Sequence, residues 1–221
     1  MAYTFILGVD VVPSDENRLT AAFAVVEKST EDQDDTAYYR VDRLDAYRNF
    51  ESTDAVAEHI QTLLTEKPYV ARTVPIVNRT TGHGQDVLDA LGTRGLAPVG
   101  ATLSAGTSTA SGKRGEMNAT VSVHRIVDTL LALYHADRID LQPQQDTDEV
   151  SRLVRGIERF GDSGTDEEGE ERRVEMATTP DEGPYDAVVV SMGLACWLGE
   201  EQTFDPTQRL KEVPQGGRRT E

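Results

Sequence analysis

The stretch that decides the fold is YTFILGVDVV, residues 3–12. It is a run of large and β-branched apolar residues, which is typical of a central strand buried on both faces. Asp10 interrupts the apolar pattern. A buried carboxylate is costly unless a metal ion, a cation or several hydrogen-bond donors satisfy it. Asp10 is therefore either a site residue or an expensive structural one.

Working outward from this strand, the pattern predicts an α/β domain. Two further strands (19–27 and 37–47) complete an antiparallel three-strand meander, and two parallel strands (73–77 and 98–102) extend it into a mixed five-stranded sheet. Helices are predicted from residue 52 or 53, after residue 84, and at 121–136, 148–160 and 186–198. Residues 138–141 and 172–178 are expected to form a small pair of strands. We assign residues 1–201 to one domain and residues 202–221 to a polar tail.

The composition is strongly acidic. The chain has 221 residues with 39 acidic against 22 basic side chains, a net charge of −17, and its few lysines are Lys28, Lys67, Lys113 and Lys211. Such lysine-poor surfaces resemble those of extreme halophiles. A net negative charge argues against nucleic-acid binding. At molar salt, however, the Debye length falls to about 3 Å, so local groups decide.

Compartment and membrane association follow from what the sequence lacks. Cys196 is the single cysteine, so neither an internal disulfide nor a thiolate metal cluster can form. No segment approaches the roughly 18 apolar residues that a membrane span requires, and no secretory signal is recognisable. We therefore expect a cytoplasmic protein that does not contact a membrane.

Three polar segments each have a functional and a structural interpretation. The segment NRTTGHG (78–84) between a strand and a helix is either an anion site made by backbone amides or an ordinary β-to-α turn. The loop SAGTSTASGKRG (104–115) carries Lys113 and Arg114. Its glycine spacing is not that of a P-loop, so it either contacts a polyanion backbone or binds nothing. Asp186 begins a helix that is apolar nearly all round, where it is either a helix cap or a second site carboxylate.

The order of these elements is that of the ribonuclease H-like fold. More specifically, the chain resembles the C-terminal nuclease domain of phage-type terminase large subunits over about the first 200 residues. The matching pieces are Gly8-Val9-Asp10, residues 77–84 with the following helix, residues 121–141 and residues 185–198. The resemblance implies a site of two divalent metal ions, Mg²⁺ or Mn²⁺, because two hard cations clamp the attacking and leaving oxygens during phosphodiester hydrolysis.

The resemblance also implies roles for individual residues. Asp10 would bridge the metals, Asp186 would hold one of them and Asn78 would assist, while a metal-bound water attacks DNA. The family has an aspartate where this chain has Asn78 or, in another alignment, Arg79, and losing an anionic ligand weakens metal binding. Ala187 stands where the family often has a second acid. The carboxylates that could replace the missing ligand are Asp15, Asp86 and Glu182.

Contacts with DNA are expected to involve the phosphate backbone without sequence preference. The candidate residues are Lys113, Arg114, His83 and His124, and each histidine also has a structural interpretation. No P-loop is found, so the resemblance implies a separate packaging ATPase or other viral proteins as partners. The composition and the resemblance together suggest a halophilic archaeon, its virus or an integrated provirus as the source.

Two functions remain open at this stage. The chain is a metal-dependent DNA endonuclease of terminase type, or a catalytically degenerate DNA-binding or assembly module with the same fold. A small-molecule α/β enzyme that uses the Gly82-His83-Gly84 turn is a third reading. The nuclease hypothesis requires the carboxylates of Asp10 and Asp186 within roughly 4 to 6 Å of each other.

Overall fold

The strands and helices follow the predicted order, with one strand, at residues 118–122, that was not predicted. The computed structural model describes residues 4–14, 18–30, 36–104, 118–141, 147–161 and 186–201. The elements are β1 (Thr4–Pro13), β2 (Leu19–Thr30), β3 (Ala37–Phe50), α1 (Thr53–Thr65), β4 (Thr73–Asn78), α2 (Gly82–Thr93), β5 (Val99–Ser104), β6 (Asn118–Ser122), α3 (Val123–His135), β7 (Ile139–Asp140), α4 (Asp148–Gly161) and α5 (Ala187–Glu201).

The described strands form one mixed sheet in the order β6-β5-β4-β1-β2-β3-β7. β1, β2 and β3 pair antiparallel as a meander. β4, β5 and β6 continue the sheet in parallel from β1, and β7 lies parallel to β3 at the other edge. The α/β class with an antiparallel and a parallel half is confirmed. The predicted count of five strands is wrong, because β6 and β7 extend the sheet to seven.

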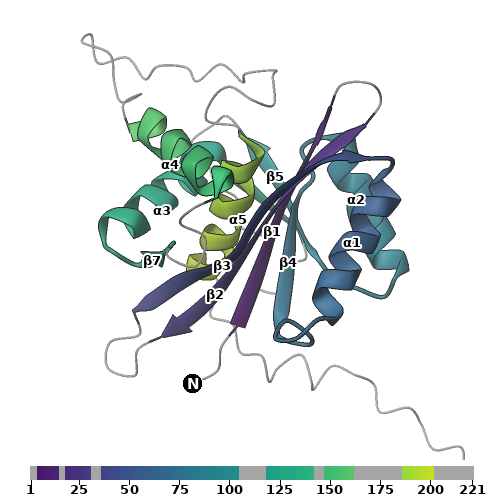
Figure 1. Ribbon diagram of the computed structural model, residues 1–221, viewed down its shortest axis with the longest axis horizontal. Helices are drawn as coiled ribbons and strands as arrows, with labels where there is room; N and C mark the ends of the chain where they lie inside the picture. Colours follow the sequence, from purple (N-terminus) through teal and green to yellow (C-terminus); the bar gives the residue numbers. More distant parts are fainter. Residues whose placement is uncertain are drawn as a thin grey trace, which may run out of the picture.

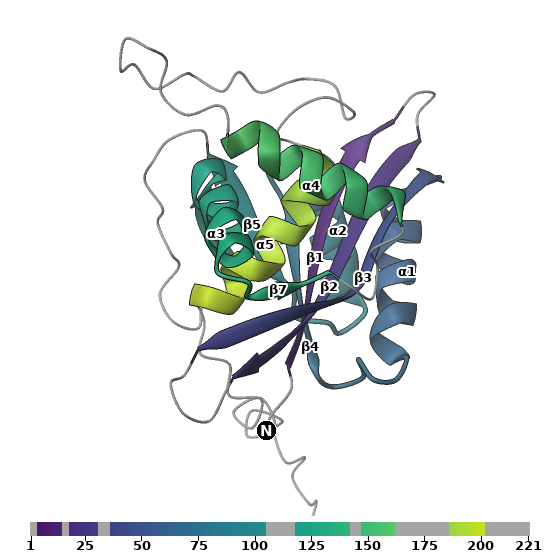
Figure 2. The same ribbon diagram turned by 60° about the vertical axis from the view of Figure 1, so that its left-hand side comes forward.

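β1 lies near the middle of the sheet and is buried on both faces. Phe5, Leu7 and Val9 pack into the layer formed with α1 and α2. Ile6 packs on the opposite side, in the larger core that also holds residues of α3, α4 and α5. Figures 1 and 2 show these two helical layers on either side of the sheet. The alternation explains why the strand reads as almost continuously apolar.

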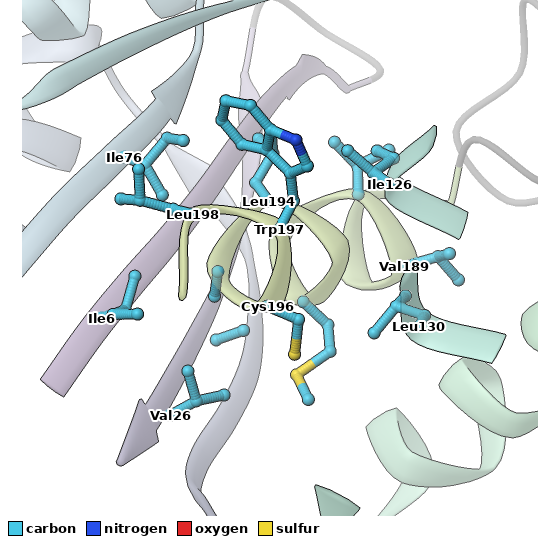
Figure 3. Close-up of a cluster of buried hydrophobic side chains, with 14 of the residues drawn as sticks. Ile6, Val26, Ile76, Ile126, Leu130, Val189, Leu194, Cys196, Trp197 and Leu198 are labelled. Carbon is cyan, nitrogen blue, oxygen red and sulfur yellow. The ribbon is translucent and has the colours of Figure 1, made fainter. Parts of the chain in front are cut away.

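α5 is the element around which the larger core is built. Every residue from 187 to 199 is buried, and Figure 3 shows the helix between strand residues such as Ile6 and Ile76 and α3 residues such as Ile126. A Cβ atom at Gly8 would lie 1.9 Å from the carbonyl oxygen of Ser191, so β1 and α5 meet backbone to backbone. No helix in the described ranges is long and apolar enough to cross a membrane.

Element boundaries differ from the prediction where sheet pairing decides them. Val121 and Ser122 were expected to open a helix, yet they belong to β6, because β6 pairs with β5 in parallel register. The extended stretch at 138–141 forms β7, which pairs with β3 through Ile139 and Asp140. The predicted strand at 172–178 and the tail at 202–221 lie outside the described residues.

Candidate functional site

The carboxyl ends of β1 and β4 bring Asp10 and Asn78 together. The two strands run parallel, and Gly8 is the register partner of Ile76. Val9 and Val77 are the last register partners, and Asp10 and Asn78 directly follow them. Side chains alternate between the two faces of a strand, and Gly8 and Ile76 both face α5. Asp10 and Asn78 therefore project from the α5 face of the sheet.

Asn78 joins β1 to β5 through hydrogen bonds. Its Nδ2 donates to Oδ1 of Asp10 at 2.8 Å. Its Oδ1 accepts from the backbone N–H of Thr80 at 3.0 Å and from the Thr80 hydroxyl at 2.6 Å. Because a backbone amide can only donate, these contacts define which end of the Asn78 side chain is the oxygen. The Thr80 hydroxyl accepts in turn from the backbone N–H of Leu103 at 2.7 Å.

Asp10 is almost completely buried, with 2% of its surface exposed. Burial raises its pKa from 3.8 to about 6, because a charged carboxylate is disfavoured away from water. The hydrogen bonds from Asn78 and from the backbone of Val11 lower the pKa, and the negative charge of Asp186 raises it. At neutral pH Asp10 is therefore mostly ionised, in a place where ionisation is unfavourable.

Asp186 immediately precedes α5 and is also buried. Its Oδ1 accepts from the backbone N–H of Val188 at 2.9 Å, which is the helix-capping role that its position predicts. Its carboxylate also pairs with Arg152 of α4. Arg152 Nε donates to Oδ2 at 3.0 Å, and Nη2 lies 3.0 Å from Oδ1 and 2.9 Å from Oδ2. A guanidinium thus engages both oxygens of Asp186.

Of the three residues predicted to form the site, Asn78 and Asp10 are in hydrogen-bond contact. The separation of roughly 4 to 6 Å between the carboxylates of Asp10 and Asp186 stays a prediction. Asp186 lies close enough for its charge to act on Asp10. Arg152 was not predicted as part of the site. Its partner lies 34 positions away along the chain, and an arginine on an amphipathic helix gives no sign of such a contact. The site therefore contains two carboxylates, one amide and one guanidinium.

These side chains, as arranged, do not fit two divalent metal ions. Mg²⁺ and Mn²⁺ need oxygen ligands, but the oxygen of Asn78 already accepts two hydrogen bonds, and both oxygens of Asp186 are engaged by Arg152. Among the described residues, no group of three or more His, Cys, Asp or Glu side chains is placed to hold a metal.

Of the carboxylates suggested as replacement ligands, only Asp86 lies in the part of the chain that the structure describes. Asp86 lies on α2, at an exposed position. The buried residues of α2 pack against the face of the sheet opposite to α5. Asp86 therefore lies in the other layer, and it does not take the place of the missing ligand. Asp15 and Glu182 lie outside the described residues.

The segment after β4 is used for close packing. Thr81 caps α2 by accepting the Gly84 N–H at 3.4 Å. A Cβ atom on Gly84 would lie 1.8 Å from the carbonyl oxygen of Asn78, whereas at Gly82 nothing lies within 4 Å. Gly84 thus allows α2 to begin directly against the residue that contacts Asp10. Anion binding by this turn stays a prediction.

Of the predicted DNA-contacting residues, the structure describes His83 and His124. His83 lies in the first turn of α2 and His124 in the first turn of α3, so they belong to opposite helical layers. Lys113 and Arg114 lie outside the described parts of the chain. Arg79, the alternative to Asn78 in the alignment, extends over the neighbouring strands: its Nε donates to Thr102 and its Nη1 to Asn118.

Comparison of the chain with family models, with curated proteins and with solved structures finds no significant match. The family resemblance consequently stands on the residues and their order. The geometry around Asp10, Asn78 and Asp186 carries the functional argument.

Proposed function

We propose that this chain is a ribonuclease H-like domain of the terminase-nuclease type that binds DNA, or joins a DNA-packaging assembly, without cutting DNA. Three features support the type: the β1–β3 meander, β4 parallel to β1, and a late buried helix on the same face of the sheet. The hydrogen bond of Asn78 with Asp10, and the effect of the Asp186 charge on Asp10, support it further.

The observation that carries the loss of cleavage is the orientation of Asn78. Where the family has a metal-binding carboxylate, this chain directs an amide N–H to Asp10. An N–H donor cannot ligate a cation, but it stabilises the Asp10 anion directly and lowers the pKa of this carboxyl. Asn78 therefore supplies by hydrogen bonding part of the stabilisation that a metal ion would otherwise provide.

The proposed partners follow from the same resemblance. DNA would be held through its phosphates by Lys113, Arg114, His83 and His124, and a separate packaging ATPase would supply the motor. With a net charge of −17, binding to DNA requires conditions in which long-range repulsion is screened. The protein is accordingly proposed to work at high salt.

The second candidate is the metal-dependent endonuclease, with Mg²⁺ or Mn²⁺ at Asp10, Asp186 and Asn78. One observation favours it: burial raises the pKa of Asp10 to about 6 beside a second carboxylate, and carboxyl groups perturbed in this way cluster at functional sites. This candidate requires Asn78 to turn its oxygen inward and Arg152 to leave Asp186.

The deciding experiment combines DNA binding and cleavage in high-salt buffer. Supercoiled plasmid is incubated with Mn²⁺ or Mg²⁺ and the wild type, with Asp10→Asn as the matched variant, and binding is followed by fluorescence anisotropy of labelled duplex DNA. We expect binding by both proteins and nicking by neither. Metal-dependent nicking that Asp10→Asn abolishes would establish the endonuclease instead. A folded protein that neither binds nor nicks DNA would refute the endonuclease and the DNA-binding role, and would leave only the role in an assembly.

A further inference from the structure

Arg152 is placed where its charge acts on Asp186 at short range. Three contacts of 2.9 to 3.0 Å join the guanidinium to the carboxylate. The side chains are 21% and 11% exposed, so this pair is largely shielded from water. Planar, bidentate pairs of arginine with carboxylate are the strong form of this interaction. Asp186 is therefore held by a cation that belongs to the chain itself.

The packing of α4 on α5 explains how Arg152 reaches this position. Gly156 lies one helical turn after Arg152, and a Cβ atom there would lie 2.4 Å from Cγ2 of Val189. Leu153 and Ile157 are buried in the same core as α5. The absence of a side chain at Gly156 thus lets α4 approach the first turn of α5, which directs Arg152 onto Asp186.

The charges around Asp10 and Asp186 indicate what Arg152 replaces. β1 and α5 meet backbone to backbone at Gly8 and Ser191, two residues before Asp10 and five after Asp186, and the charge of Asp186 acts on Asp10. Two carboxylates with one guanidinium leave a net negative charge. Without the guanidinium, two neighbouring carboxylates remain, which is a pairing that attracts a hard divalent cation. In the wild type, the positive charge of Arg152 repels a cation that comes to Asp186.

We propose that Arg152 is an intramolecular substitute for a divalent cation, and that its removal uncovers a site for Mn²⁺ or Mg²⁺ formed by Asp186 and Asp10. The inference rests on the proposed function, since it takes the wild-type site to be satisfied without metal. It goes further by assigning the exclusion of metal to one side chain on α4.

The test measures metal binding rather than cleavage. Arg152→Met removes the charge and keeps much of the side-chain volume, and Arg155→Met is the matched control, since Arg155 is exposed on the same helix. Mn²⁺ is titrated into each protein by calorimetry, and melting temperatures are recorded in EDTA and in Mn²⁺. We expect Arg152→Met to melt below the wild type in EDTA, because Asp186 loses its partner, and to recover in Mn²⁺.

The calorimetric result decides the proposal. Arg152→Met is expected to bind Mn²⁺ at least roughly tenfold more tightly than the wild type, since a positive charge a few Å away opposes an incoming cation. Adding Asp186→Asn should abolish the gain, and Arg155→Met should behave as the wild type. Equal affinity of Arg152→Met and the wild type would overturn the proposal. If Arg152→Met does not fold in either buffer, Arg152→Gln is judged by the same criterion.

Failure of this inference is distinguishable from failure of the proposed function. A wild-type protein that takes up Mn²⁺ as tightly as Arg152→Met, yet never nicks DNA, would refute the role of Arg152 alone. Nicking by the wild type that depends on Asp10 would refute the proposed function.

Discussion

Asp10→Asn is expected to stabilise the protein at neutral pH and to lose this advantage in acid. Burial raises the pKa of Asp10 from 3.8 to about 6 in the folded chain. Each unit corresponds to about 1.4 kcal/mol, so ionised Asp10 costs the folded state about 3 kcal/mol above both pKa values. The folded state binds the proton more tightly than the unfolded chain. The favourable contribution of protonated Asp10 to the free energy of unfolding is therefore complete below pH 3.8 and is lost as the pH rises through about 6.

The assay is urea unfolding in high-salt buffer with EDTA, from about pH 4 to about pH 7. Asparagine cannot ionise, so the free energy of unfolding of Asp10→Asn relative to the wild type should rise by about 2 kcal/mol over this range. Asp86→Asn makes the same chemical change at an exposed position and controls for the general effect of removing a charge. A difference between Asp10→Asn and the wild type that is independent of pH would refute the reasoning.

Three further substitutions test the packing and the hydrogen bonds at the site. Gly84→Ala should destabilise the protein by about 2 kcal/mol or more, because its Cβ would meet the backbone of Asn78, whereas Gly82→Ala, in open space, should stay within about 0.5 kcal/mol of the wild type in urea unfolding. Asn78→Ala removes a hydrogen bond that lowers the pKa of Asp10, so a carboxyl NMR titration should show this pKa rising further. An unchanged or lower pKa would show that Asn78 does not stabilise the Asp10 anion. Ile126→Ala should cost about 2 to 5 kcal/mol by urea unfolding, because the side chain is fully buried.

Much of the central architecture could be predicted from local patterns. β1 reads as a two-sided buried strand because both of its faces are covered, and α5 reads as a buried helix because it is apolar all round. Asp10 is conspicuous for the same reason, since a single carboxylate in an apolar run has a visible cost. These signals lie within short stretches and do not depend on distant partners.

The pairing of the edge strands could not be predicted, because it is not local. β6 has the sequence NATVS, which carries little strand signal on its own, and it becomes a strand through parallel pairing with β5. A strand was expected at residues 138–141, where β7 lies, but its pairing with β3 was not. Tertiary pairing of this kind overrides weak local preference.

The sequence pointed to Asp10 and Asn78 as neighbours, but not to the chemistry of their contact. The motifs indicated Asp10, Asn78 and Asp186, but the orientation of Asn78 depends on donors from Thr80, and the oxygens of Asp186 are engaged by Arg152. Neither contact can be predicted from the spacing of residues in the sequence. The interpretation of Asn78 as a metal ligand therefore required the structure to test it.

The most direct test of the central claim is a crystal structure of the wild type grown in Mn²⁺, with anomalous data collected at the manganese absorption edge. The account predicts no anomalous peak between Asp10 and Asp186, with Arg152 on Asp186 and the amide nitrogen of Asn78 facing Asp10. An anomalous peak bound by Asp10 and Asp186, with Arg152 displaced, would contradict it.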